Sequence, residues 1–303
     1  MTHDVRSRAA GSPIGERAAA EPSATATPVG RVAELWRYPV KSMLGTRADR
    51  LVVTARGVLG DRAWALRDLE TGRVASAKRF HRLLDFRAGY ERQPAAHDHG
   101  RAWIRTPGGE ILHTDDPDIS ERLSRLLGHP MQLEDRAASD EKASIDRKTV
   151  FGDVPVSDMK PEWTPETMPD YFQLMSGTFL EIGPVHLLAS GSVDHLRRLQ
   201  RGTAQFDRRR FRTNIYIDTA DARGRFVEDD WTDGALHVGH DVVLTDLEPT
   251  VWCVTSTLAQ QELPRDLSVL RTIAQHHRGC LGVYASVPSG GAVRVGDPIT
   301  LRR

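Results

Sequence analysis

The sequence is poor in several features that would indicate a particular class of protein. It has only two cysteines in 303 residues, Cys253 and Cys280, and their spacing suggests neither a disulfide framework nor a zinc site. Lysine and arginine number 41, as do aspartate and glutamate, so no net charge attracts nucleic acid or an anionic membrane. Aromatic residues make up 6%, too few for a platform that stacks single-stranded nucleic acid. We therefore expect no nucleic-acid or membrane partner.

Long apolar runs and recognisable targeting or nucleotide motifs are also missing. No apolar stretch approaches the roughly 18 residues of a membrane span, and residues 1–30 lack the apolar region of a secretory signal. We expect a cytoplasmic protein, in which a free thiol can persist. The sequence has no Gly-x-Ser-x-Gly elbow, Walker loop or dinucleotide-binding fingerprint.

What the chain does contain is a series of short strand-like segments. Alternating or β-branched runs at 32–40, 51–53, 63–66, 74–78 and 83–90 are separated by glycine, proline and aspartate turns. Strands at intervals of about 8–12 residues are typical of a barrel or sandwich and not of a βαβ fold. The fold class predicted is mainly β with a few helices (α+β).

Three segments have the apolar spacing of helices. The first covers 116–127, with Asp118 as its cap. The second begins at Ser190 or Ser192 and ends at Gly202. The third is capped by Asp266 and ends near residue 279.

Composition divides the chain into four parts. Residues 1–28 are predicted to be a disordered tail, and 29–135 an N-terminal β-barrel-like domain. A proline-rich, charged linker covers 136–170, and a second β-barrel domain covers 171–303.

Cys253 lies in the run Leu247–Thr257, which is rich in β-branched and hydroxyl residues. This composition predicts a strand or strand end, with Pro249 at its entry because proline cannot donate to a sheet. A lone cysteine is most often a small buried hydrophobic residue. Packing is therefore the simplest interpretation of Cys253 when it is considered alone.

Cations stand next to hydroxyls or amides in three further segments. The groups concerned are Lys41-Ser42, Arg62 with Lys78, and Arg212-Thr213-Asn214. Guanidinium, ammonium and hydroxyl groups suit a phosphate or another anion, although each group alone is equally consistent with solvated surface. Convergence of these groups around Cys253 would favour an anionic ligand.

Taken together, these segments resemble a known family over about residues 30–303. The N-terminal matches are Tyr38-Pro39-Val40-Lys41-Ser42, Gly60-Asp61-Arg62-Ala63-Trp64 and Ser76-Ala77-Lys78. The C-terminal matches include Gly183–Leu188, Arg210–Ile215, Cys253–Thr257 and Leu281–Ala285. The chain resembles proteins in which a MOSC N-terminal β-barrel domain precedes a MOSC domain, a group that includes amidoxime-reducing enzymes.

The resemblance implies a molybdenum cofactor (Mo-pyranopterin) and a set of residues that hold it, whereas pyridoxal phosphate is not expected. Cys253 would ligate molybdenum and be the catalytic residue. The cofactor-binding residues implied are Lys41, Ser42, Arg62, Lys78, Arg212 and Asn214.

The sequence departs from the family at three of these places. Lys78 replaces a frequent arginine, Thr213 a frequent proline, and Trp252 the arginine that usually precedes the cysteine. A cation beside a cysteine favours the thiolate, so Trp252 bears directly on metal binding. Trp252 could instead form a wall of the pocket.

The activity implied is reduction of N-hydroxylated or N-oxide substrates with an external electron donor, either a ferredoxin-like protein or a flavoprotein reductase. Two cysteines are too few for an internal ferredoxin-type cluster. One alternative is a non-redox MOSC module that binds or carries the cofactor, or carries sulfur as a persulfide on Cys253. Another is a two-domain β protein in which Cys253 is only packed.

Overall fold

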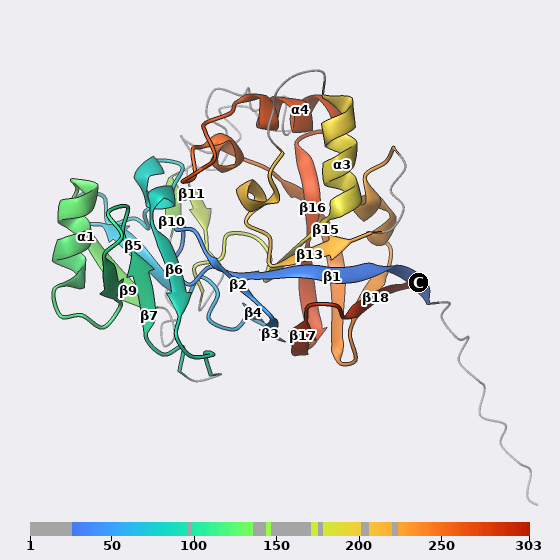
Figure 1. The fold of residues 1–303 in the computed structure, drawn as a ribbon, viewed down its shortest axis with the longest axis horizontal. Helices are drawn as coiled ribbons and strands as arrows, with labels where there is room; N and C mark the ends of the chain where they lie inside the picture. The colour runs from blue at the N-terminus through green and yellow to red at the C-terminus, as the bar shows by residue number, and fades with distance from the viewer. Residues whose placement is uncertain are drawn as a thin grey trace, which may run out of the picture.

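The fold consists mainly of strands, as Figure 1 shows for the computed structural model of the chain. The structure describes residues 26–95, 98–135, 144–146, 171–174, 178–200, 206–219 and 224–303. The strands of the N-terminal half are β1 (Thr27–Arg37), β2 (Thr46–Ala48), β3 (Arg50–Thr54), β4 (Gly57–Val58), β5 (Trp64–Asp68), β6 (Arg87–Tyr90), β7 (Ala102–Arg105), β8 (Ile111–His113), β9 (Met131–Asp135) and β10 (Ser144–Asp146). The remaining strands are β11 (Tyr171–Gln173), β12 (Val185–Ala189), β13 (Ile215–Asp218), β14 (Ala235–Val238), β15 (Val242–Val251), β16 (Cys280–Ser289), β17 (Gly291–Arg294) and β18 (Pro298–Arg302). The mainly β prediction is confirmed.

Helices are few among the described residues. The α-helices are α1 (Ile119–Leu127), α3 (Ser190–Leu199) and α4 (Ser268–His277). The short 3-10 helices are η1 (His81–Asp85), η3 (Arg208–Phe211), η4 (Val227–Trp231) and η5 (Val254–Thr257). All three helices predicted from the sequence are present.

Seven strands close into a barrel that occupies the C-terminal half. Their order is β13-β12-β16-β15-β14-β18-β1, and β1 pairs back with β13 to complete the ring. Closure leaves no exposed edge in the ring. The inward-facing side chains, among them Leu35, Leu187, Ile215 and Leu244, are fully buried and form the largest core cluster.

Strand β1 comes from the N-terminal half, yet it completes this barrel. It pairs with β18 through Thr27 and Leu301 and with β13 through Leu35 and Ile215. The predicted start of structure at Val32 is wrong, because pairing with β18 extends β1 back to Thr27. The four-part division of the chain stays a prediction.

In the rest of the N-terminal half, β3 pairs with β17 from the far end of the chain, and Leu51 and Val293 of this pair belong to the barrel core. Around a second core, β5 pairs with β9, and β7 pairs with both β6 and β8. Helix α1 buries Ile119 and Leu123 in this core and ends at Gly128, whose left-handed φ of 69° suits a helix terminus. Figure 1 shows this half beside the barrel, with α3 and α4 packed at one end of the barrel.

Several local predictions need correction. Residues 81–85 form η1, so only 87–90 of the predicted strand at 83–90 is extended. The predicted strand at 74–78 is reduced to one bridge between Val74 and Arg67. Part of the expected linker, residues 144–146, is strand β10, which pairs with β11.

The helix caps also differ from the prediction. Asp118 and Ser190 make no side-chain cap, and Ser192 donates to Glu228 instead. Asp266 does accept the backbone N–H of Ser268, 3.0 Å away, at the start of α4. The predicted helix end at Gly202 lies outside the described residues.

Candidate functional site

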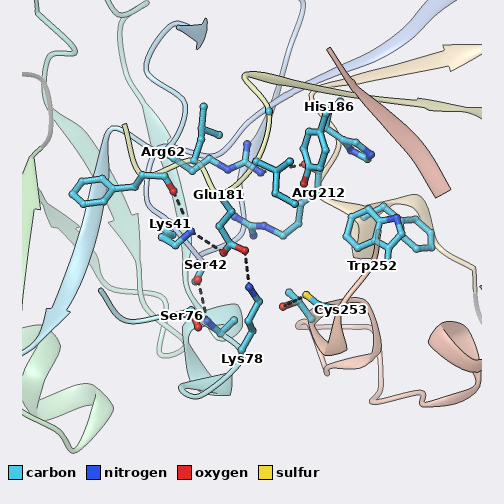
Figure 2. Close-up of a pocket in the computed structure, with 18 of the residues that line it drawn as sticks. Lys41, Ser42, Arg62, Ser76, Lys78, Glu181, His186, Arg212, Trp252 and Cys253 are labelled. Carbon is cyan, nitrogen blue, oxygen red and sulfur yellow. Dashed lines mark hydrogen bonds and ion pairs between the residues drawn. The ribbon is translucent and has the colours of Figure 1, made fainter. Parts of the chain in front are cut away.

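A pocket lies where the N-terminal half meets the barrel. Its space, including the mouth that opens to solvent, is about 740 Å³. All seven residues that the sequence singled out line it: Lys41, Ser42, Arg62, Lys78, Arg212, Asn214 and Cys253. Figure 2 shows the cations on one side of the pocket, with Trp252 and Cys253 on the other. The predicted convergence is therefore observed, whereas the roles of these residues stay predictions.

Cys253 is presented by a turn and not by a strand. Strand β15 ends at Val251, and Cys253 precedes η5 (Val254–Thr257), so of the predicted strand or strand end over Leu247–Thr257 the strand-end form is the one observed. The hydroxyls of Ser256 and Thr257 donate to the carbonyls of Cys253 and Val254, at 3.0 and 2.7 Å. Such bonds compete with a sheet ladder, which explains why a β-branched run turns here.

Pro249 lies inside β15 and not at its entry. It is paired with Val283 of β16, while the other neighbour of β15 pairs only as far as Leu244. Pro249 therefore occupies a part of β15 that has a partner on one side only, where a missing N–H is tolerated.

Two hydrophobic clusters hold the Cys253 turn in place. On the barrel side, Trp252 is buried beneath α3 and α4 and donates its indole N–H to Leu281, 2.7 Å away. On the other side, Val254 and Leu258 pack against Leu44 and two further residues of the N-terminal half. The thiol of Cys253 is left partly exposed, 3.3 Å from the hydroxyl of Thr255.

Glu181 joins two buried lysines across the pocket. Its carboxylate accepts from Lys41 Nζ at 2.8 Å and from Lys78 Nζ at 2.6 Å, and both lysine side chains are only 5% exposed. Lys41 also donates to the carbonyl of Phe179, 3.0 Å away. Ser42 accepts the backbone N–H of Ala77, so the loops that carry the two lysines are tied together.

These contacts set the protonation of the three groups. Burial raises the pKa of Glu181, but the two lysines outweigh it and hold the pKa well below its usual range. Burial, opposed by Glu181 and assisted by Lys78, lowers the pKa of Lys41 to about 8. For Lys78 burial also lowers the pKa, but Glu181 and Cys253 raise it above its ordinary value. Lys78 therefore stays charged, while Lys41 can lose its proton in mildly alkaline solution.

Arg62 and Arg212 enclose the ring of Tyr38. Their guanidinium carbons lie 4.6 and 4.5 Å from the ring centre, in cation–π contact. Arg62 forms an ion pair with the fully buried Asp61, which raises its pKa against the effect of burial. Burial and the neighbouring Arg62 lower the pKa of Arg212 to about 10, so both remain charged at neutral pH.

The side chain of Asn214 bonds to residues that shape the pocket. Its amide donates to Asp61 at 3.1 Å, and its carbonyl oxygen accepts the backbone N–H of His186 at 3.2 Å. Both polar ends are thus already engaged in holding neighbours of the pocket.

Three of the predicted site residues have a strained backbone. Ser42, Arg62 and Arg212 have φ values of 68°, 46° and 44°, in the left-handed region that non-glycine residues rarely adopt. Strain of this kind persists only where the surroundings enforce it, and it is concentrated at functional sites. The folding of these loops thus fixes where the three side chains point.

Sequence reasoning missed two residues of the pocket, Glu181 and His186. Glu181 is one carboxylate in a chain with many, and its partners lie 140 and 103 residues away. His186 sits in a strand of buried residues, where only its polarity among apolar neighbours gave a signal. Glu181 belongs to no motif with a recognisable spacing, and His186 lies in the family match Gly183–Leu188 without having been assigned a role there.

The pocket holds an excess of buried positive charge. Lys41 and Lys78 share Glu181 and Arg62 pairs with Asp61, so four cations stand against two carboxylates, a net of two positive charges, and Arg212 has no ion pair among the described residues. Buried charge is costly unless it is paired. The arrangement is suited to an anionic ligand such as a phosphate.

Replacing Glu181 by glutamine tests how far this bridge stabilises the fold. Glu181→Gln leaves two buried ammonium groups without their partner, and we expect the free energy of unfolding to fall by about 2 kcal/mol. Urea titration measures it. Glu121→Gln, which breaks an exposed pair with Arg125 on α1, is the control and should change stability by less than about 0.5 kcal/mol. Equal stability of the two variants would contradict the role assigned to Glu181.

The pKa of Lys41 predicts how anion binding depends on pH. Below about pH 8 Lys41 is charged and sulfate should bind most tightly, whereas above it the affinity should fall as the proton is lost. The stability of the ligand-free protein depends on pH in the opposite direction. Between about pH 8 and pH 10.5 Lys41 is protonated mainly in the unfolded state, so its contribution to the free energy of unfolding rises with pH. The charge of sulfate does not change over this range. Calorimetric titration from pH 6 to pH 9.5 therefore isolates the protein's own ionisation.

Lys41→Arg is the matched control, because arginine remains charged throughout this range. Its sulfate affinity should show no decline near pH 8. A decline identical to that of the unchanged protein would assign the ionisation to another group.

Two family models match the chain. The MOSC domain matches residues 177–300, and the MOSC N-terminal beta barrel domain matches residues 29–147.

No helix among the described residues has both the length and the apolar character needed to cross a membrane.

Individual proteins resemble this chain at low sequence identity. Mitochondrial amidoxime reducing component 2 of Bos taurus is 25% identical over 300 residues, which cover 89% of this chain and 83% of the relative. Mitochondrial amidoxime-reducing component 1 of Mus musculus is 23% identical over 296 residues, 90% of this chain and 82% of the relative. A solved structure, the YUAD protein from Bacillus subtilis, covers 90% of this chain and 95% of its own, with 10% identity and a TM-score of 0.44. From the two family matches, the chain belongs to the MOSC-domain family and carries the MOSC N-terminal β-barrel domain ahead of its MOSC domain.

Proposed function

We propose that the protein binds the pyranopterin molybdenum cofactor and reduces N-hydroxylated or N-oxide compounds with electrons from a separate donor. The relatives named above are amidoxime-reducing components, which supports this class of substrate. The observation that carries the proposal is one pocket that combines a partly exposed cysteine with four cations against only two carboxylates. A cytoplasmic location stays a prediction.

The residues of the pocket fit the chemical groups of this cofactor. A thiolate is a soft ligand of the kind that such a metal centre takes. Four cations, of which Lys41 and Lys78 are almost fully buried, offer charge and hydrogen bonds to a phosphate. Cys253 would therefore ligate molybdenum, while the cations and Ser42 would hold the pterin and its phosphate.

Trp252 does not remove the cationic environment that Cys253 needs. In its place, Lys78 lies close enough for the negative charge of Cys253 to contribute to its raised pKa. The indole itself is 7% exposed and walls the pocket, with its N–H engaged by Leu281. Lys78 thus supplies a cation near Cys253 in place of the family's arginine.

The overall reaction consumes two electrons and two protons for each N–O bond that is cleaved, and gives the reduced nitrogen compound and water. When bound, the cofactor supplies this two-electron chemistry. The chain's part is to hold the cofactor through Cys253 and the cations and to shape the cavity for the substrate. With two cysteines in the chain, a separate ferredoxin-like protein or flavoprotein reductase would deliver the electrons.

Substitution of the two cysteines separates ligation from general effects of thiol loss. Cys253→Ser should abolish benzamidoxime reduction and lower bound molybdenum, because a hydroxyl is a poor soft ligand. Stability should change by about 1 kcal/mol or less, since the side chain is only partly buried. Cys280→Ser, outside the pocket at the start of β16, should keep both activity and metal.

The experiment uses protein from a host that makes the cofactor. Molybdenum is measured by mass spectrometry, pterin by fluorescence after oxidation, and turnover with a reduced viologen dye. Protein without molybdenum or pterin, and without turnover, would falsify the proposal.

The same measurements identify the alternative of a non-redox carrier. A protein that binds pterin, or releases sulfane sulfur from Cys253 on treatment with cyanide, but reduces no N-oxygenated substrate would be a carrier of cofactor or sulfur.

A further inference from the structure

His186 is a polar residue of the pocket that the cofactor assignment leaves unused. It lies on β12, is 4% exposed and lines the same pocket as Cys253. Both ring nitrogens, Nδ1 and Nε2, are buried and have no hydrogen-bond partner. Its backbone, in contrast, is held at both ends by Thr213 and Asn214. A fixed ring with two unsatisfied nitrogens is costly unless something else in the pocket meets them.

The imidazole is uncharged at any physiological pH. Burial and the charge of Arg62 lower its pKa to about 3. The Leu281 carbonyl, which accepts a 2.7 Å bond from the indole of Trp252, lies near the ring and acts in the opposite direction, although it makes no hydrogen bond of normal geometry with either ring nitrogen. A neutral imidazole offers one donor and one acceptor, so His186 is matched to an uncharged partner and not to a phosphate.

Aromatic rings flank His186 on both sides. The ring of Trp252 is 5.5 Å away at 75°, and that of Tyr284 is 5.3 Å away at 53°. Figure 2 shows His186 and Trp252 together on the side of the pocket opposite Lys41 and Lys78. Aromatic rings and His186 thus form one wall of the pocket opposite the two lysines, while Arg62 lies near enough to His186 for its charge to act on the ring.

We propose that His186, Trp252 and Tyr284 form the substrate subsite and select uncharged, planar N-hydroxylated compounds. This inference rests on the proposed function. His186 is the residue that hydrogen-bonds the N–OH group, and the two neighbouring rings pack against the planar remainder of the substrate. Amidoximes meet these requirements, since they are planar and neutral at pH 7 and offer both a donor and an acceptor. Trimethylamine N-oxide does not, because it has no donor and is not planar.

Two substitutions of His186 test the subsite. His186→Leu keeps the volume and removes both polar atoms, whereas His186→Gln keeps one donor and one acceptor. For His186→Leu we expect KM for benzamidoxime to rise roughly threefold to tenfold, the loss of one neutral hydrogen bond, with kcat/KM for trimethylamine N-oxide unchanged. For His186→Gln we expect KM for benzamidoxime to stay within about twofold. A purely structural role would affect both substrates alike.

Binding is also measured without turnover. Calorimetry of benzamidoxime with each protein should show the same loss of affinity for His186→Leu, at equal molybdenum and pterin content. Unchanged affinity, an equal loss for both substrates, or a loss of pterin in His186→Leu would overturn the subsite, the last because it would place His186 against the cofactor. If His186→Leu does not fold, His186→Gln and Tyr284→Phe carry the comparison. Failure of the proposed function is distinct, since the unchanged protein would then lack cofactor and turnover altogether.

Discussion

The burial of two lysines against one carboxylate is the interaction on which the rest of the site depends. Lys41 and Lys78 belong to loops of the N-terminal half, while Glu181 lies just before barrel strand β12. A charge withdrawn from water must be paired, so these groups are satisfied only when the two halves are together. Folding of the halves against each other therefore creates the pocket, and it also leaves two further positive charges inside it.

Closure of the barrel also helps to bring Lys41 and Cys253 together. Because β1 pairs with both β13 and β18, the chain enters the N-terminal half from the barrel wall, four residues before Lys41. The Cys253 turn is clamped between clusters from both halves. The thiol and the lysines thus share one rigid frame, a precondition for holding a ligand between them.

The sequence predicts the site better than it predicts local structure, for physical reasons. Cys253, Arg62 and Lys78 stand in short runs that place a reactive or charged group at a turn, and such runs can be recognised without knowing the fold. Glu181 cannot be found in this way, because its role arises from partners more than 100 residues distant. The composition of Leu247–Thr257 predicts a strand or strand end but not the residue at which the strand ends. That point depends on the hydroxyls of Ser256 and Thr257, which donate to backbone carbonyls nearby.

The two walls of the pocket separate two tasks that one kind of residue could not perform together. Buried cations hold an anion tightly, whereas His186 is kept neutral chiefly by its burial, with a smaller contribution from the charge of Arg62 that lowers its pKa further. The neutral ring keeps both a donor and an acceptor. Withdrawal of the pocket from water therefore serves both tasks: it strengthens the attraction of the cations for an anionic cofactor, and it keeps an uncharged surface for a neutral substrate.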